Sequence, residues 1–196
     1  MLRRSLLISF LSCAFFSNIL FSNNVVAKTP APPANPKVTI ETSKGKIVVE
    51  LFADKAPVTV ANFLHYVDLG FYNGTLFHRV IPNFMIQGGG FDIKMTEKPT
   101  GEPIKNESNN MLGNERGTLA MARTGDPNSA TAQFFINLRV NEYLDFHPGQ
   151  PGYAVFGKVI EGMNVVDEIA KVETKQTQLS EALPLEPVLI QSMKKQ

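Results

Sequence analysis

Residues 77–90 constrain the fold of this chain more than any other stretch. Two apolar, β-prone runs flank a Pro-Asn pair and end in three glycines, which predicts a hairpin. Strand side chains alternate between the two faces of a sheet, so Arg79 should point outwards if Val80 points into a core. Met85 and Gln87 also share one face of the second strand. We therefore expect a guanidinium, a thioether and an amide to gather on the outside of a sheet.

The run 133–137 repeats this pattern with an aromatic residue on the outer face. Phe134 and Ile136 share the apolar face, which leaves Phe135 between two amide side chains on the other face. A large exposed aromatic residue is out of place on such a face unless it lines a pocket. The alternative from spacing alone is a stray exposed ring, just as Arg79 could be a surface arginine in an ion pair.

The remaining patterns predict a mainly β chain with two helices. Sparse periodicity over 92–116 and Pro/Gly content over 145–153 indicate loops. Many short strands with two helices indicate a closed antiparallel β-barrel capped by two α-helices. The other expected strands are 37–42, 46–51, 118–122, 153–159 and 188–192, and the helices begin at Pro57 and include Val165, Ile169 and Val172.

Composition limits the function classes. The 196 residues are 43% apolar and 19% charged, which is ordinary globular material. A net charge of +1 gives no long-range attraction to nucleic acid or to an acidic membrane. The three histidines lack the spacing of a known metal motif, so we expect no metal and no cofactor.

The N-terminal residues 1–27 have the three parts of a secretory signal peptide. Arg3 and Arg4 precede an apolar run, and small residues suited to cleavage end at Ala27. A retained membrane anchor is the alternative, but the run is short and interrupted by polar residues. A lipoprotein that uses Cys13 is a weaker alternative, because the apolar run continues past that residue. Cleavage would change the net charge to −1 and remove the one cysteine.

Three segments follow from this division. Residues 28–36 contain four prolines and predict an extended tether. Residues 37–196 form the globular domain. A mature chain without thiols suits an oxidising compartment and excludes disulfides and thiolate chemistry.

Four separated runs carry a family resemblance: 77–90, 117–122, 133–137 and 155–159. In this order they resemble the signature of the cyclophilins, and the likeness covers residues 37 to 193. The resemblance implies an eight-stranded barrel with a groove on its outer surface. It also implies a monomer with peptidyl-prolyl cis-trans isomerase activity, which acts on proline-containing flexible segments without covalent or metal chemistry.

The same resemblance assigns roles to residues. Arg79 would donate to the prolyl nitrogen, which recovers its lone pair as the amide twists over a barrier of about 18–20 kcal/mol. Phe135 would form the floor of a proline slot, and Gln87 would orient the arginine or the substrate backbone. The implied substrate-binding residues are Phe84, Met85, Ala122, Arg123, Gln133, Tyr143, Leu144 and Tyr153. From the residues alone, Met85 and Leu144 could be ordinary core, the glutamines could be solvated, and alternation would point Phe84 inwards unless a bulge lies near the turn.

Departures from the family pattern bear on ligands and location. Tyr143 stands where many eukaryotic cyclophilins have tryptophan, Tyr153 replaces a pocket histidine, and Arg123 replaces an asparagine whose backbone the family mainly uses. We expect isomerisation to survive and cyclosporin binding to be weak. The variations resemble the exported bacterial branch, which suggests a periplasmic protein without stable membrane association after cleavage; secretion is the alternative.

Other function classes fit less well. A binder of proline segments or a holdase chaperone on the same scaffold would keep Phe135 and Met85 but would not need Arg79. A nucleotide site at Gly88–Gly90 lacks the spaced glycine fingerprint, and no G-x-S-x-G serine hydrolase motif is present.

Overall fold

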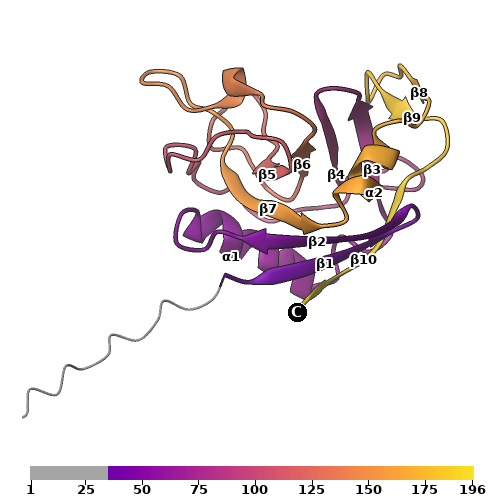
Figure 1. Cartoon of the computed structure of the whole chain (residues 1–196), viewed down its shortest axis with the longest axis horizontal. Helices are drawn as coiled ribbons and strands as arrows, with labels where there is room; N and C mark the ends of the chain where they lie inside the picture. The colour runs from indigo at the N-terminus through magenta and orange to yellow at the C-terminus, as the bar shows by residue number, and fades with distance from the viewer. Residues whose placement is uncertain (1–34) are drawn as a thin grey trace, which may run out of the picture. The chain divides into compact units, whose positions relative to one another are not determined.

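A closed antiparallel barrel forms the part of the chain that the structure describes. The computed structural model describes residues 35–196, so the predicted signal peptide and most of the tether lie outside the described residues. Eight strands close in the order β1-β10-β3-β4-β6-β5-β7-β2 (Figure 1). Their bounds are Lys37–Thr42 (β1), Gly45–Leu51 (β2), Thr75–Ile81 (β3), Met85–Asp92 (β4), Thr118–Met121 (β5), Phe134–Asn137 (β6), Val155–Glu161 (β7) and Leu189–Lys195 (β10). The predicted mainly β, eight-stranded barrel is confirmed.

Two α-helices accompany the barrel, as predicted. Helix α1 spans Pro57–Asp68, with its proline in the first turn where a missing N–H costs nothing. Helix α2 spans Met163–Ile169 and lies next to the β1–β2 turn, where a Val165 methyl would lie 3.0 Å from a Cβ added at Gly45. Val172, which we expected within this helix, lies beyond its end. Within residues 35–196 no helix is long and apolar enough to cross a membrane.

The sequence patterns missed the smaller elements. A short 3₁₀ helix spans Glu142–Leu144, and a two-stranded sheet pairs β8 (Thr174–Lys175) with β9 (Leu183–Pro184). Two-residue strands are too short to show a period, so no alternation marks them. The small sheet lies between α2 and β10 in the chain and near β3 in space.

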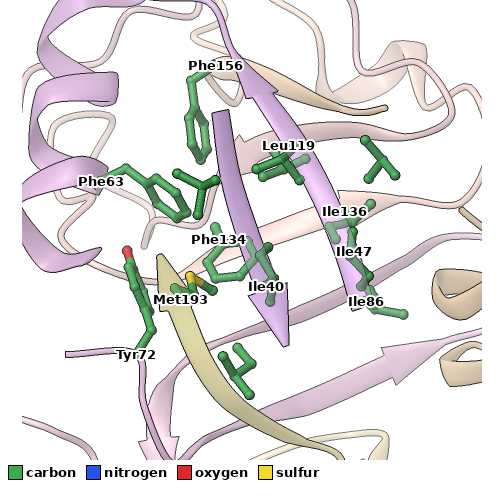
Figure 2. Close-up of a cluster of buried hydrophobic side chains, with 14 of the residues drawn as sticks. Ile40, Ile47, Phe63, Tyr72, Ile86, Leu119, Phe134, Ile136, Phe156 and Met193 are labelled. Atoms are coloured by element: carbon green, nitrogen blue, oxygen red, sulfur yellow. The ribbon is translucent and has the colours of Figure 1, made fainter. Parts of the chain in front are cut away.

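Side chains from both barrel and helix fill the interior. The ring of Phe63 in α1 packs at a tilt against Tyr72 and Phe156, at centroid distances of 5.2 and 5.1 Å, and it meets Phe134 edge-on at 5.6 Å. Figure 2 shows these rings beside the inward-facing isoleucines of β1, β2, β4 and β6. The alternation predicted for the two central strands holds, because Val80 and Ile86 belong to this core.

A second, smaller apolar cluster lies apart from the main core. Its buried members are Met85, Ala120, Phe135, Leu144 and Val155. Met85, Ala120 and Phe135 each directly adjoin a main-core residue on the same strand, so they occupy the opposite, outer face of the sheet. The barrel wall therefore has apolar side chains on both sides where β4, β6, β5 and β7 run next to one another. Three residues of this outer cluster, Met85, Phe135 and Leu144, also line the hollow described below.

Candidate functional site

Nine side chains line one open hollow over the outer cluster. Its volume is about 180 Å³. Pockets for drug-sized ligands have volumes of about 300–1,000 Å³, so this hollow suits a single ring or side chain. All nine belong to the predicted site: Arg79, Phe84, Met85, Gln87, Ala122, Arg123, Phe135, Leu144 and Tyr153.

Phe135 is packed by neighbours rather than standing free on the surface. The side chain is only 4% exposed, although its position on β6 faces away from the barrel interior. Tyr153 meets the ring edge-on at a centroid distance of 5.7 Å, and Met85 and Leu144 share its cluster. A buried aromatic ring on the outer face of a sheet requires a covering structure, which the loop 145–153 and the 3₁₀ helix supply. The result is an apolar floor with apolar sides.

The Arg79 side chain extends from β3 and lines the hollow together with Phe135 and Met85. Its Nη1 lies 3.3 Å from Oε1 of Gln87 and 3.6 Å from the sulfur of Met85. The guanidinium carbon is 5.6 Å from the centroid of the Phe84 ring. On its other edge, Nε and Nη2 donate to one carboxylate oxygen of Glu181 at 2.9 and 2.5 Å. Arg79 is thus both the ion-paired arginine and the pocket arginine that spacing left as alternatives.

A chain of amides extends from the arginine along the wall. Gln87 accepts from Arg79 and donates through Nε2 to Oε1 of Gln133 at 3.1 Å. Gln133 in turn donates to Glu97 at 3.2 Å. Gln133 lines an adjoining hollow, which shares Gln87, Ala122 and Arg123 with the first. Gln133, a predicted site residue, therefore lies beside the first hollow and is connected to it through Gln87.

The side chain of Arg123 packs on one wall of the hollow and binds the loop beside it. Its guanidinium lies over the Tyr153 ring at 4.3 Å and donates to the carbonyls of Pro151 (2.8 Å) and Gly152 (3.3 Å). These contacts hold the end of the loop 145–153 against the hollow. Tyr153, which stands where the family pattern has a histidine, is one of the side chains that line the hollow.

Tyr143 lies at the rim and does not line the hollow. It is 57% exposed and stacks on Phe84 at a centroid distance of 5.9 Å. The neighbouring Leu144 points the other way, into the outer cluster. Consecutive positions of the 3₁₀ helix thus supply one rim residue and one wall residue.

Phe84 reaches the hollow for a different reason from the one we expected. The strands pair without a shift at this end, with Val80 opposite Ile86 and Ile81 opposite Met85, so no bulge is present there. Phe84 instead closes a tight turn in which its N–H donates to the carbonyl of Ile81, and Asn83 has a positive φ of 58°. Strand alternation does not apply to a turn residue, and the ring is free to face outwards.

A buried amide network beneath the site carried no motif in the sequence. Asn141 donates to the backbone carbonyl of Phe84 at 3.0 Å and to Asn137 at 2.7 Å. Asn137 donates to Asn114, which also donates to Asp145 at 2.9 Å. The network ties the turn on one side of the hollow to the loop on the other. Asn114 lies 23 residues before Asn137, and the other members fall in a turn-rich stretch without strand or helix periodicity, so no pattern marked them.

His78 neighbours Arg79 but is not among the side chains that line the hollow. The side chain is 4% exposed, its ring lies 4.6 Å from that of Phe91, and its Nδ1 has no hydrogen-bond partner among residues 35–196. Burial lowers its pKa to about 4, opposed by a backbone hydrogen bond at Leu76 and assisted by the charge of Arg79. The ring is therefore neutral at neutral pH, which fits a packing role beside the site.

The geometry defines a class of site. A small apolar slot, an arginine at its edge and hydrogen-bonding amides along one side suit a polypeptide that inserts one ring and is held by its backbone. Within residues 35–196 no three or more His, Cys, Asp or Glu side chains gather as metal ligands. Gly88–Gly90 lies within strand β4 of the barrel wall and not in a loop before a helix, which argues against a phosphate-binding loop.

Comparisons with known proteins agree with this class. The family "Cyclophilin type peptidyl-prolyl cis-trans isomerase/CLD" matches residues 37–195. A peptidyl-prolyl cis-trans isomerase of Acinetobacter baylyi is 56% identical over 160 residues, which are 82% of this chain and 85% of that protein. A crystal structure of a cyclophilin-type isomerase from Cryptosporidium parvum has a TM-score of 0.70 at 28% identity and covers 83% of this chain and 98% of its own. A second structure of that protein, in the presence of the dipeptide Ala-Pro, has a TM-score of 0.67 at 28% identity, with 80% of this chain and 96% of its own covered.

The chain belongs to the cyclophilin-type peptidyl-prolyl cis-trans isomerases. Its activity is the cis-trans isomerisation of peptide bonds that precede proline, as the resemblance implied.

Proposed function

We propose that the hollow over Phe135 is where the X-Pro bond rotates and that Arg79 is the catalytic donor. The proline ring would lie on Phe135 between Met85 and Leu144. The backbone before and after the proline would lie along Gln87 and Ala122. The contiguity of these side chains in one hollow of about 180 Å³ supports this placement.

The chemistry requires stabilisation of a twisted amide and no bond exchange. Rotation removes the amide resonance, so the prolyl nitrogen becomes pyramidal and regains a lone pair. An N–H donor directed at that lone pair binds the transition state more strongly than either planar ground state. Acceleration from minutes to milliseconds is about five decades, or about 7 kcal/mol. A preorganised donor, an apolar slot and backbone hydrogen bonds can together supply a transition-state stabilisation of this size.

The position of the Arg79 guanidinium carries this proposal. It lies next to the sulfur of Met85 and over the ring of Phe84, and protein acceptors hold two of its edges. Arginine has five N–H groups and these contacts occupy at most four of them, so a donor remains for a substrate. An arginine that served only to solubilise the surface would have no need of an apolar hollow beside it.

The test is the turnover of an Ala-Pro tetrapeptide by the mature 28–196 protein and its Arg79→Ala variant. We expect kcat/KM to fall about 10²- to 10³-fold, the usual cost of removing one transition-state donor. Arg79→Lys should recover little, because an ammonium lacks the planar fork. Lys158→Ala, which removes an exposed cation of β7 outside the hollow, is the control and should retain full turnover. Near wild-type turnover in a folded Arg79→Ala variant would remove Arg79 from the mechanism.

The alternative is that binding of proline segments, or a holdase activity, is the main task of this scaffold. The hydrogen-bonded arginine favours catalysis over simple binding, because a protein that only binds an apolar segment needs no cation at the site. Affinity of Arg79→Ala for the same tetrapeptide separates the two roles. Catalysis predicts nearly unchanged binding with lost turnover, whereas a holdase predicts equal suppression of aggregation of an unfolded client by both proteins.

We further propose proline-containing segments of exported proteins as the substrates. The Ala-Pro dipeptide used with the Cryptosporidium parvum relative supports the proline part, and the pattern of residues 1–27 supports export. Expression of the full chain followed by periplasmic extraction and N-terminal sequencing tests the second part. The expected mature start is Lys28, and an uncleaved, membrane-bound chain would contradict it.

Two further properties follow as proposals. The exposed Tyr143 at the rim should give only weak inhibition by cyclosporin, which a titration of turnover measures. Analytical ultracentrifugation should show a monomer for residues 28–196.

A further inference from the structure

Glu181 contacts the arginine from a segment with no role in the proposed site. It lies between β8 and β9, where Thr177 and Ser180 close a turn by mutual hydrogen bonds of 2.7 and 3.0 Å. The next residue, Ala182, accepts a backbone hydrogen bond from Val80 at 2.9 Å. The backbone on one side of Glu181 is thus fixed to the residue that follows Arg79 in β3.

The carboxylate holds one edge of the guanidinium. Oε1 of Glu181 accepts from Nε at 2.9 Å and from Nη2 at 2.5 Å, while Gln87 and Met85 contact Nη1. Hydrogen bonds between ionised partners are shorter and stronger than neutral ones. The arginine side chain is 28% exposed, so without the carboxylate the guanidinium could turn towards solvent.

We propose that Glu181 is a positioning residue for isomerisation: it fixes the Nε–Nη2 edge of Arg79 so that the remaining free N–H faces the proline slot. The proposal rests on the proposed role of Arg79. Glu181 is absent from the side chains that line the hollow, so it acts through the arginine and not on the substrate. A donor fixed before the substrate arrives needs no reorganisation in the transition state.

The direction in which kcat changes when the Glu181 carboxylate is removed tests the proposal, because a carboxylate can also act against catalysis. It attracts the same N–H groups that the prolyl lone pair needs. Positioning predicts that removal of the carboxylate lowers kcat, whereas competition predicts that removal raises kcat. The proline slot is formed by other side chains, so positioning also predicts a nearly unchanged KM.

The experiment compares Glu181→Ala and Glu181→Gln with Glu186→Gln in the mature protein. Glu186 lies just after β9, is exposed and has no ion pair or side-chain hydrogen bond with any described residue, so its variant controls for loss of charge. We expect Glu181→Ala to lower kcat about two- to fivefold, the range that the energy of a partly exposed ion pair sets through the rate equation. Glu181→Gln keeps an acceptor oxygen and should recover part of the loss. Glu186→Gln should match the wild type.

A spectroscopic readout reports position directly. In ¹⁵N NMR spectra the Arg79 Nε–H signal should be sharp and slow to exchange with water in the wild type. It should be broadened or lost in Glu181→Ala while the backbone amides of the barrel keep their shifts. Unchanged guanidinium dynamics, or a kcat equal to or above that of the wild type, would overturn the inference.

A double variant distinguishes failure of this inference from failure of the proposed function. If Arg79→Ala turns over substrate like the wild type, the role of Arg79 itself is wrong. If Arg79→Ala is impaired, Glu181→Ala added to it should cause no further loss, because the partner that it positions is gone. An equal fold-loss in both backgrounds would mean that Glu181 acts by another route, and the inference would be wrong.

Discussion

Replacement of His78 should remove a specific part of the protein's sensitivity to acid. The ring is 4% exposed, and burial lowers its pKa to about 4. In an unfolded chain histidine has a pKa of about 6.5. As the pH falls below 6.5, the unfolded state therefore binds a proton that the folded state does not accept until the pH approaches 4. Protonation favours the unfolded state across this window.

The size of the effect follows from the two pKa values. A difference of about 2.5 pH units at 1.36 kcal/mol each is about 3 kcal/mol, reached below pH 4. At pH 5 the loss is already about 2 kcal/mol, and above pH 7 it vanishes. Because folded domains have only about 5–15 kcal/mol of stability, a loss of this size is readily measured.

The assay is urea unfolding at pH 7.5 and pH 5.0 for the wild type, His78→Phe and His147→Asn. Phenylalanine keeps the ring contact with Phe91 and cannot titrate. Any fixed packing cost cancels in the difference between the two pH values, as do carboxylates common to all three proteins. We expect the wild type and His147→Asn, an exposed control, to lose about 2 kcal/mol more than His78→Phe. Equal pH dependence in all three proteins would refute the assignment of this loss to a buried neutral histidine.

Two other predictions test the supports of the fold and of the site. Glu107 accepts hydrogen bonds from the N–H (2.8 Å) and the hydroxyl (2.7 Å) of the buried Thr59 at the start of α1, so Glu107→Ala should cost about 2–3 kcal/mol in urea unfolding. Turnover below the unfolding transition should not change, and a stability loss near zero would contradict this cap. A Cβ at Gly90 would lie 2.5 Å from Gln133, so Gly90→Ala should displace that amide from Gln87. We expect lower kcat/KM with little loss of stability, because the clash is with a flexible side chain; unchanged turnover would show that the amide chain is dispensable.

Strand alternation predicted the outer face of the site because it depends on the local backbone alone. Val80 and Ile86 point into the main core, while Met85 and Phe135 point outwards. A two-residue period is fixed by the pleat, whichever strands become neighbours. This explains why the sequence located the arginine, the thioether and the aromatic floor on one surface before any pairing was known.

The sequence could not reveal contacts that depend on chain segments far apart. The neighbour order β4-β6-β5-β7 is not the chain order, and no period encodes it. Strand alternation does not predict the direction of Phe84, because this residue lies in a turn where Asn83 has a positive φ. Glu181 lies 102 residues from Arg79 in a stretch whose two strands have two residues each, so neither motif nor period marked it.

The ion pair of Arg79 shows why two interpretations of one residue need not exclude each other. Spacing alone offered a surface arginine in a salt bridge or a donor at a slot, as if one guanidinium could serve only one partner. Its five N–H groups lie in a rigid plane with distinct edges. One edge meets Glu181, another meets Gln87 and Met85, and the group still lines the hollow. An exposed salt bridge contributes at most about 1 kcal/mol to stability, so its consequence for this enzyme is better sought in kcat than in the free energy of unfolding.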